Sequence, residues 1–176
     1  WGQGPTHSQN LQAWFSHIPG LKVVMPTTPA DAKGLLITSI FDPNPVVFLE
    51  HRWLHNSIGE VPDGDFRISI GEAKVVRDGA DVTIVSMSYM TWRAIFNSVK
   101  KTGRLIALDS GFTTGSVAGE LVAKVAIELF SSLKAPPARL AMPDIPEPTS
   151  PALTKGFYTR AVDIAEKVMF MMGKDI

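Results

Sequence analysis

Apolar positions in the first third of the chain alternate between two spacings. Residues 8–18 have the one-sided pattern of an amphipathic helix. Residues 21–25 and 46–49 are short, continuous apolar runs, which are typical of strands in a parallel sheet covered on both faces. Between these runs, Thr28 followed by Pro29 predicts the start of a second helix. The order helix, strand, helix, strand predicts an α/β fold.

The pattern changes after this region. Residues 58–70 contain polar residues together with Gly59, Pro62 and Gly64, which predicts a linker. We therefore expect a first domain over residues 1–57 and a second over residues 71–176.

The second region contains apolar runs that suit an alternation of strands and helices. Residues 72–77 and 81–87 flank Asp78-Gly79, which predicts a β-hairpin. The later pattern predicts, in order, a helix over 92–101, a strand over 104–109, a helix over 117–130 capped by Ser116, an edge strand over 136–142 and a closing helix over 160–172.

Composition narrows the class of protein. Hydrophobic residues make up 45% of the chain and charged residues 19%, enough apolar material for a packed core. The net charge of zero gives no electrostatic argument for a nucleic-acid partner. No run of 18 apolar residues is present, so no membrane span is expected. The absence of cysteine excludes disulfides, thiolate catalysis and cysteine-ligated zinc within this sequence.

The first ten residues carry the strongest chemical signal. Two glycines and a proline make a permissive backbone, and His7 lies directly before a helical pattern. A titratable side chain on such a loop is typical of a site that transfers protons near pH 7. His17 at a predicted helix end is better explained as structural. His51 and His55 lack a third ligand in the pattern, so we do not expect a metal there.

Several short motifs, taken in order and spacing, resemble one known family. They are His7-Ser8-Gln9, Pro19–Val24, Asp31–Leu36, Asp42–Pro45, Glu60–Pro62, Gly79–Val85 and Ser98–Leu105. Together they are similar to the beta subunit of thiamine-diphosphate-dependent 2-oxoacid dehydrogenases, the decarboxylating component, in the transketolase-like family. The resemblance implies an α/β fold: a remnant of a pyrimidine-binding domain, then a transketolase C-terminal-like three-layer α/β/α domain with a mostly parallel sheet.

The resemblance also implies a function. The beta subunit would take part in oxidative decarboxylation of a 2-oxoacid, with acyl transfer to a lipoyl acceptor. Its partners would be an alpha subunit, a second beta subunit in a heterotetramer, and a lipoyl acyltransferase core. Thiamine diphosphate with magnesium would be shared with the alpha subunit. His7 would be the active-site histidine, because the family has a histidine before Ser-Gln there.

A potassium site is a further expectation. Ser39, Asp42 and Asn44 surround a helix end and the turn after it, where free carbonyl oxygens suit a hard cation. Related beta subunits hold potassium at this turn, mainly through backbone oxygens, so the resemblance implies such a site here. An ordinary capped turn is the alternative.

The sequence departs from the family pattern in two places. The glutamate that activates the cofactor in the family has no counterpart here, since Glu50 does not lie in its motif. A helix and a strand of the family are also missing between Thr91 and Trp92, so we expect a gap of about 30 residues there.

These departures leave alternatives open. One is a non-catalytic dimerisation or scaffold module that retains the transketolase C-terminal fold. Another is a relative such as a transketolase or an acetoin dehydrogenase, and the candidate substrates are pyruvate, branched-chain 2-oxoacids and acetoin. The sequence does not decide between the bacterial cytoplasm and the mitochondrial matrix.

Overall fold

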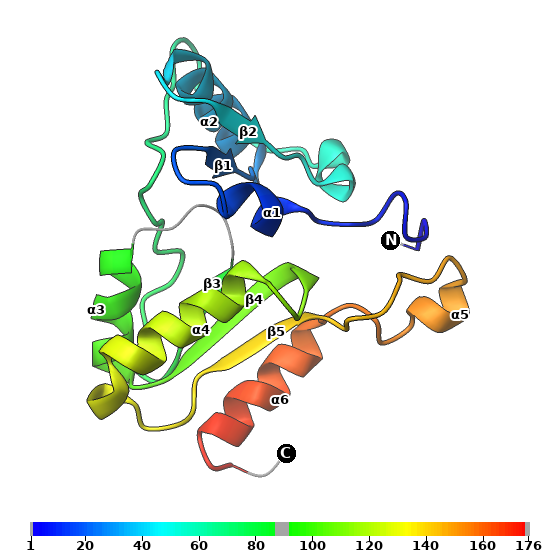
Figure 1. Ribbon diagram of the computed structural model, residues 1–176. Coiled ribbons are helices and arrows are strands. Elements are labelled where there is room, and N and C mark those ends of the chain that lie inside the picture. The colour runs from blue at the N-terminus through cyan, green and yellow to red at the C-terminus, as the bar shows by residue number, and fades with distance from the viewer. Residues whose placement is uncertain (1, 87–91, 175–176) are drawn as a thin grey trace. The chain divides into compact units, whose positions relative to one another are not determined.

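The computed structural model describes residues 2–86 and 92–174. Helices and strands alternate along most of this length (Figure 1). In chain order they are α1 (Gln12–Ser16), β1 (Lys22–Val24), α2 (Pro29–Phe41), β2 (Val46–Phe48), the 3-10 helix η1 (Arg52–Asn56), β3 (Thr83–Ser86), α3 (Trp92–Thr102), β4 (Leu105–Phe112), α4 (Val117–Glu128), the 3-10 helix η2 (Phe130–Ser132), β5 (Ala138–Met142), α5 (Pro151–Thr154) and α6 (Ala161–Met171).

The chain divides into two compact units. The N-terminal unit comprises residues 11–74, and the C-terminal unit comprises residues 2–10, 75–86 and 92–174. Residues 2–10, which the sequence pattern places with the first domain, thus pack with the C-terminal unit.

The N-terminal unit is built on one strand–helix–strand crossover. Strands β1 and β2 pair in parallel, from Lys22 opposite Val46 to Val24 opposite Phe48, and α2 connects them. Helix α2 begins at a capping box, because the Thr28 hydroxyl accepts from the Asp31 backbone N–H and the Asp31 carboxylate accepts from the Thr28 N–H. The predicted strands and the predicted helix start are confirmed.

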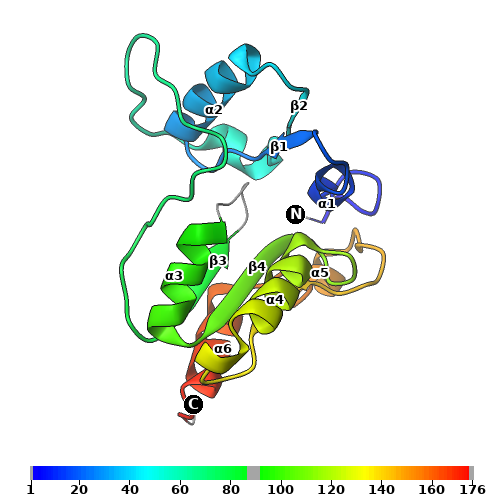
Figure 2. The ribbon, with the colours of Figure 1, turned by 60° about the vertical axis from the view of Figure 1, so that its left-hand side comes forward.

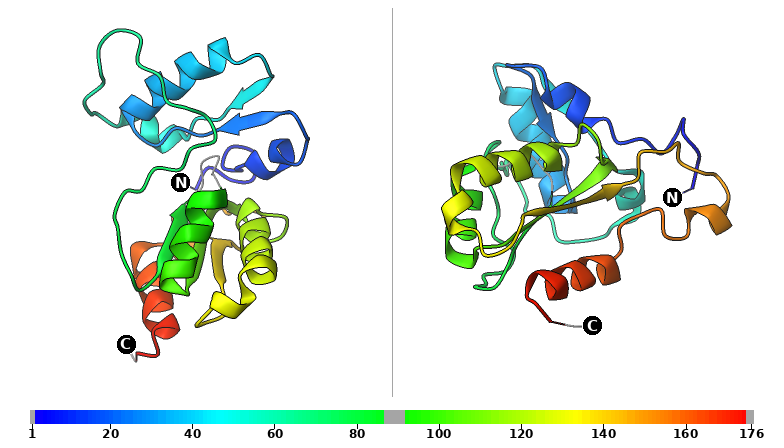
Figure 3. Two further views of the ribbon diagram at one scale, coloured as in Figure 1. Left: turned by 90° about the vertical axis from the view of Figure 1, so that its left-hand side faces the viewer. Right: turned by 60° about the horizontal axis from the view of Figure 1, so that its bottom comes forward.

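The C-terminal unit contains a parallel sheet in the order β3-β4-β5. Helices α3 and α4 cover one face of this sheet, and α6 lies on the other face (Figures 2 and 3). The central strand β4 supplies the core, where Leu105, Ile106 and Ala107 are fully buried. The predicted α/β class with parallel sheets is confirmed, and β5 is an edge strand among the described residues, as expected.

The predicted hairpin is wrong. Residues 72–77 form no strand, and Val75 and Val76 are 72% and 89% exposed. Strand β3 begins at Thr83 and pairs in parallel with β4 instead. The Asp78 carboxylate accepts from the Gly79 N–H and from Lys101, so the Asp-Gly step joins a loop to α3 rather than two strands.

The first helix is shorter than predicted. It begins at Gln12 rather than residue 8, because the Ser8 hydroxyl is used by the preceding loop, where it accepts from the Gln3 N–H. Among residues 2–86 and 92–174, no helix combines the length and apolar character needed to cross a bilayer.

Candidate functional site

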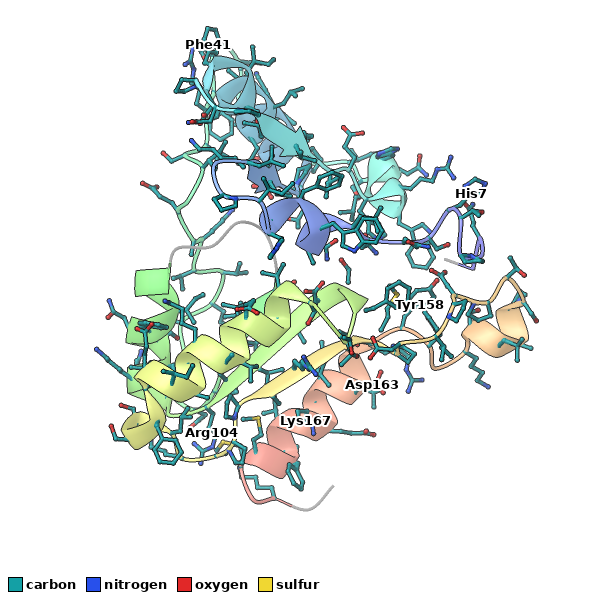
Figure 4. All side chains as sticks on the ribbon, viewed as in Figure 1. His7, Phe41, Arg104, Tyr158, Asp163 and Lys167 are labelled. Carbon is teal, nitrogen blue, oxygen red and sulfur yellow. The ribbon has the colours of Figure 1, made fainter. Side chains whose placement is uncertain are left out.

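His7 lies at the end of a tight turn. Its backbone N–H donates to the Gly4 carbonyl at 3.3 Å, and the Gln9 side chain donates to the Pro5 carbonyl at 2.7 Å. The neighbouring Ser8 is buried at 2% exposure and accepts from the Gln3 N–H at 3.2 Å. The turn is therefore held by hydrogen bonds between its own residues, while the His7 imidazole is exposed (Figure 4).

The start of this loop is anchored to the last part of the chain. The Gly2 N–H lies 3.1 Å from Glu147 Oε1 and 3.0 Å from the Tyr158 hydroxyl oxygen. At Gly4, φ is +76°, and a Cβ atom there would lie 2.6 Å from Thr149 Cγ2. Only glycine fits this position, because both the backbone angle and the close approach exclude a side chain.

The end of the loop is anchored to the central strand of the sheet. The Asn10 side chain donates to the Ser110 carbonyl at 2.8 Å, near the carboxyl end of β4. Directly before Ser110, the buried Asp109 carboxylate accepts from the Gly111 N–H at 2.8 Å and from the Ala118 N–H at 3.1 Å. The carboxyl edge of a parallel sheet is where α/β proteins bind ligands, and the His7 loop lies there within its own unit.

This arrangement suits proton transfer. An exposed imidazole can hold or release a proton near neutral pH, and a loop fixed at both ends limits where that imidazole can go.

The predicted potassium residues lie together in the turn after α2. The Asp42 N–H donates to the Ser39 carbonyl, and Asp42 Oδ1 accepts from the Asn44 N–H at 2.9 Å and from its side-chain amide at 3.1 Å. Asp42 Oδ2 lies 2.5 Å from Lys22 Nζ. The Lys22 ammonium, with help from Asn44, lowers the pKa of the Asp42 carboxyl to about 2.

The Asp42 carboxylate is thus already paired with a cation. Any potassium ion at this turn would depend on backbone oxygens, and the site remains a prediction. Among residues 2–86 and 92–174, no group of three or more histidine, aspartate or glutamate side chains is arranged to hold a metal.

The other histidines lie outside the His7 loop. His17 is the exposed C-cap of α1, as predicted. His55 pairs with Glu50 at 3.2 Å. Burial is the main cause that lowers the pKa of His51, which favours its neutral form.

Sequence reasoning missed the groups that hold the loop. Residues 143–151 lie between the predicted edge strand and the predicted closing helix, where no site residue was expected, yet this segment supplies Glu147 and Thr149. One signal was present: Glu147 is a carboxylate placed directly between two prolines. Nothing near Tyr158 or Asn10 marked their long-range partners.

Comparison with known families agrees with this architecture. Residues 2–56 match the transketolase pyrimidine-binding domain family, and residues 90–164 match the transketolase C-terminal domain family. The chain belongs to the transketolase-like family. The match that begins at residue 2 includes the His7 loop, so in this family member the loop is part of the pyrimidine-binding sequence although it packs with the C-terminal unit.

Curated relatives of this transketolase-like chain are beta subunits. The Acetoin:2,6-dichlorophenolindophenol oxidoreductase subunit beta of Cupriavidus necator is 39% identical over 90% of this chain and 56% of its own length. The pyruvate dehydrogenase E1 component subunit beta of Rhizobium meliloti is 39% identical over 92% of this chain and 42% of its own. The mitochondrial 2-oxoisovalerate dehydrogenase subunit beta 2 of Arabidopsis thaliana is 36% identical over 82% of this chain and 49% of its own. The chain spans about half the length of these relatives.

A solved structure supports the fold. A split gene transketolase, described as an inactive beta4 tetramer, superposes with a TM-score of 0.70 at 16% identity. The match covers 92% of this chain and 60% of the other. At this identity the likeness concerns the fold alone, which is the predicted transketolase-like α/β architecture.

Proposed function

We propose that this chain is part of the beta subunit of a thiamine-diphosphate-dependent 2-oxoacid dehydrogenase, in which His7 manages protons at the substrate. The observation that carries the proposal is the His7 loop: an exposed imidazole on a turn whose two ends are hydrogen-bonded to the C-terminal unit. The names of the beta-subunit relatives supply the reaction class.

The protein's part in such a reaction is proton transfer and charge stabilisation. When bound, thiamine diphosphate supplies the carbanion chemistry at the substrate carbonyl. The protonated His7 imidazole would donate a hydrogen bond, and then its proton, to the oxygen on which negative charge develops. The neutral imidazole that results would take a proton back from that hydroxyl when the carbonyl forms again. The hydrogen bonds made by the Ser8 and Gln9 side chains hold the conformation of the turn while the charge on His7 changes.

The proposal includes partners and ions. An alpha subunit would hold the diphosphate through magnesium, a second beta subunit would complete the assembly, and a lipoyl acyltransferase would accept the acyl group. A potassium ion would bind at the turn of Ser39, Asp42 and Asn44 through backbone oxygens, since the Asp42 side chain is occupied by Lys22 and Asn44.

The gap predicted between Thr91 and Trp92 also belongs to the proposal, and Thr91 lies outside the described residues. The alignment with the Cupriavidus necator subunit is 188 positions long, whereas 90% of 176 residues is about 158. The aligned region therefore contains about 30 positions without a residue of this chain, which supports a gap of the expected size but does not locate it.

The test is His7→Ala in the full-length subunit, assembled with its alpha subunit and saturated with thiamine diphosphate. We expect kcat to fall by about 100-fold or more, the usual contribution of a general acid–base group. His17→Ala is the matched control, because His17 is an exposed histidine in the other unit. Equal kcat in His7→Ala and the wild type would contradict the role given to His7.

The substrate is tested in the same assay. Pyruvate, branched-chain 2-oxoacids and acetoin are compared by kcat/KM, because relatives of similar identity carry each of these names. The scaffold hypothesis predicts no thiamine-dependent turnover with any of them, even when the assembled complex is intact.

A further inference from the structure

Glu147 is a buried carboxylate in an unusual position. It is 2% exposed and lies between Pro146 and Pro148, beyond the end of β5. One of its oxygens, Oε1, accepts hydrogen bonds from the Gly2 N–H and from the Tyr158 hydroxyl. The other oxygen, Oε2, is buried with no hydrogen-bond partner among the described residues. Burying a carboxylate is costly, so its place calls for a compensating role.

Tyr158 gives this carboxylate a fixed orientation. Its hydroxyl donates to Glu147 Oε1, and its oxygen also lies 3.0 Å from the Gly2 nitrogen. Its ring packs edge-on against the buried Phe157, with ring centroids 5.3 Å apart. The backbone N–H of Gly2 therefore meets two acceptors held by packed side chains.

Hydrogen bonds from two consecutive backbone N–H groups connect Glu147 to the turn of His7. The Gly2 N–H bonds to Glu147, and the next backbone N–H, that of Gln3, bonds to the Ser8 hydroxyl at 3.2 Å. Ser8 is the direct neighbour of His7 and is itself buried. The Gly2 N–H thus fixes the start of the loop to Glu147, and the Gln3 N–H fixes it to Ser8, the residue next to His7.

We propose that Glu147 is a positioning residue, which with Tyr158 fixes the loop through Gly2 and so determines where the His7 imidazole lies. The inference rests on the proposed function for the effect on turnover, but the anchoring of the loop can be measured without any activity. Glu147 acts through the backbone of Gly2 and Gln3 and through Ser8.

The test uses the full-length subunit assembled with its alpha subunit. Hydrogen exchange of a peptide covering residues 2–10, read by mass spectrometry, reports the loop, and kcat and KM report turnover. For Glu147→Ala we expect faster exchange in this peptide and a fall in kcat of about 10-fold to 100-fold, because small displacements of a reacting group have effects of this size. We expect KM to change by less than about twofold, since a positioning role affects the reacting geometry more than substrate binding.

Conservative variants separate anchoring from general destabilisation. Glu147→Gln keeps an oxygen that can accept from Gly2, so its exchange and kcat should lie close to the wild type. Tyr158→Phe keeps the ring but removes the hydroxyl, and should lie between Glu147→Ala and the wild type. It also serves as the second variant if Glu147→Ala does not fold. Glu128→Ala is the control for removing a carboxylate from the same unit, because Glu128 is exposed and pairs only with Lys124 among the bonds described.

The outcomes distinguish this inference from the proposed function. Unchanged exchange in both Glu147→Ala and Tyr158→Phe overturns the inference, as does equal damage in Glu147→Gln and Glu147→Ala. The inference is also overturned if Glu147→Ala exchanges faster but keeps its kcat, while His7→Ala is inactive. If His7→Ala is fully active, the proposed function of His7 fails, and the exchange result alone decides whether Glu147 anchors the loop.

Discussion

The His7 loop and the turn after α2 are both candidate sites, and they are held in opposite ways. The bonds that anchor the ends of the loop join residues 100, 145 and 156 positions apart. The bonds of the turn join Asn44 to Asp42, two positions apart, and Ser39 to Leu35, four positions apart, with Lys22 the most distant partner at 20 positions.

This difference indicates which substitutions should disturb the geometry of each site. A locally closed turn needs little from the rest of the protein, so its geometry should survive most distant substitutions. A loop held by remote side chains depends on the packing of its whole unit, so changes far away in sequence should affect it.

Of the substitutions that test this comparison, Gly4→Ala in the loop is expected to have the largest effect. The new Cβ would lie 2.6 Å from Thr149 Cγ2 at a φ of +76°, so the loop must move. We expect kcat to fall by about tenfold or more and the free energy of unfolding to fall by about 1–3 kcal/mol, measured by urea denaturation.

Gly20→Ala is the matched control for Gly4→Ala. Gly20 has a φ of +88° but no atom within 4 Å of its added Cβ, so it carries the backbone strain without the clash. Thr149→Ser removes the clashing methyl group and should restore part of the activity of Gly4→Ala. Equal effects of the two alanine substitutions on kcat would contradict the tight contact in the loop.

A second substitution tests the strand that anchors the loop. Asp109→Ala removes a buried acceptor from the Gly111 and Ala118 N–H groups. We expect the free energy of unfolding to fall by about 1–3 kcal/mol, because both donors stay buried without that partner. Asp144→Ala is the control, since the exposed Asp144 also accepts two bonds, from Thr114, and water can replace it. An equal loss in both variants would disprove the importance of burial at Asp109.

A third substitution tests helix α2 and the turn after it, the region held by local hydrogen bonds. Thr28→Ala removes the hydroxyl that caps α2, the helix leading into the turn. The free energy of unfolding should fall by about 1 kcal/mol, with kcat unchanged. Thr28→Ser keeps the hydroxyl and should restore stability. A loss of activity in Thr28→Ala would show that the two regions are coupled.

The smallest effect is expected from protonating the Asp42 carboxyl in the turn at low pH. The Lys22 ammonium and, after it, the hydrogen bonds from Asn44 lower the pKa of Asp42 from an ordinary value of 3.8 to about 2. The stabilisation is therefore complete above about pH 4 and is lost as the pH falls through 2. In Lys22→Met the pKa should rise toward its ordinary value, followed by NMR titration of the carboxyl. An unchanged pKa would show that Asn44 alone stabilises the carboxylate.

Much of the fold could be predicted because its signals are local. The run of valines in β1, the Thr28 cap of α2 and the Ser116 cap of α4 are each visible within a few residues. The hairpin prediction around Asp78-Gly79 failed because turn composition does not reveal which strand is the partner. Strand β3 pairs in parallel with β4 through α3, a choice made by packing of α3 on the sheet.

The sequence by itself determined the α/β order, the parallel strands and the presence of a histidine on a glycine-rich loop. The tertiary structure alone decided what holds that loop: Glu147 and Tyr158 at its start, and Ser110 at its end. The physical reason is that local structure follows from periodicity and caps within a few residues. A hydrogen bond between residues 100 or more positions apart leaves no periodic trace, and it forms only when the sheet and its helices have brought the two segments together.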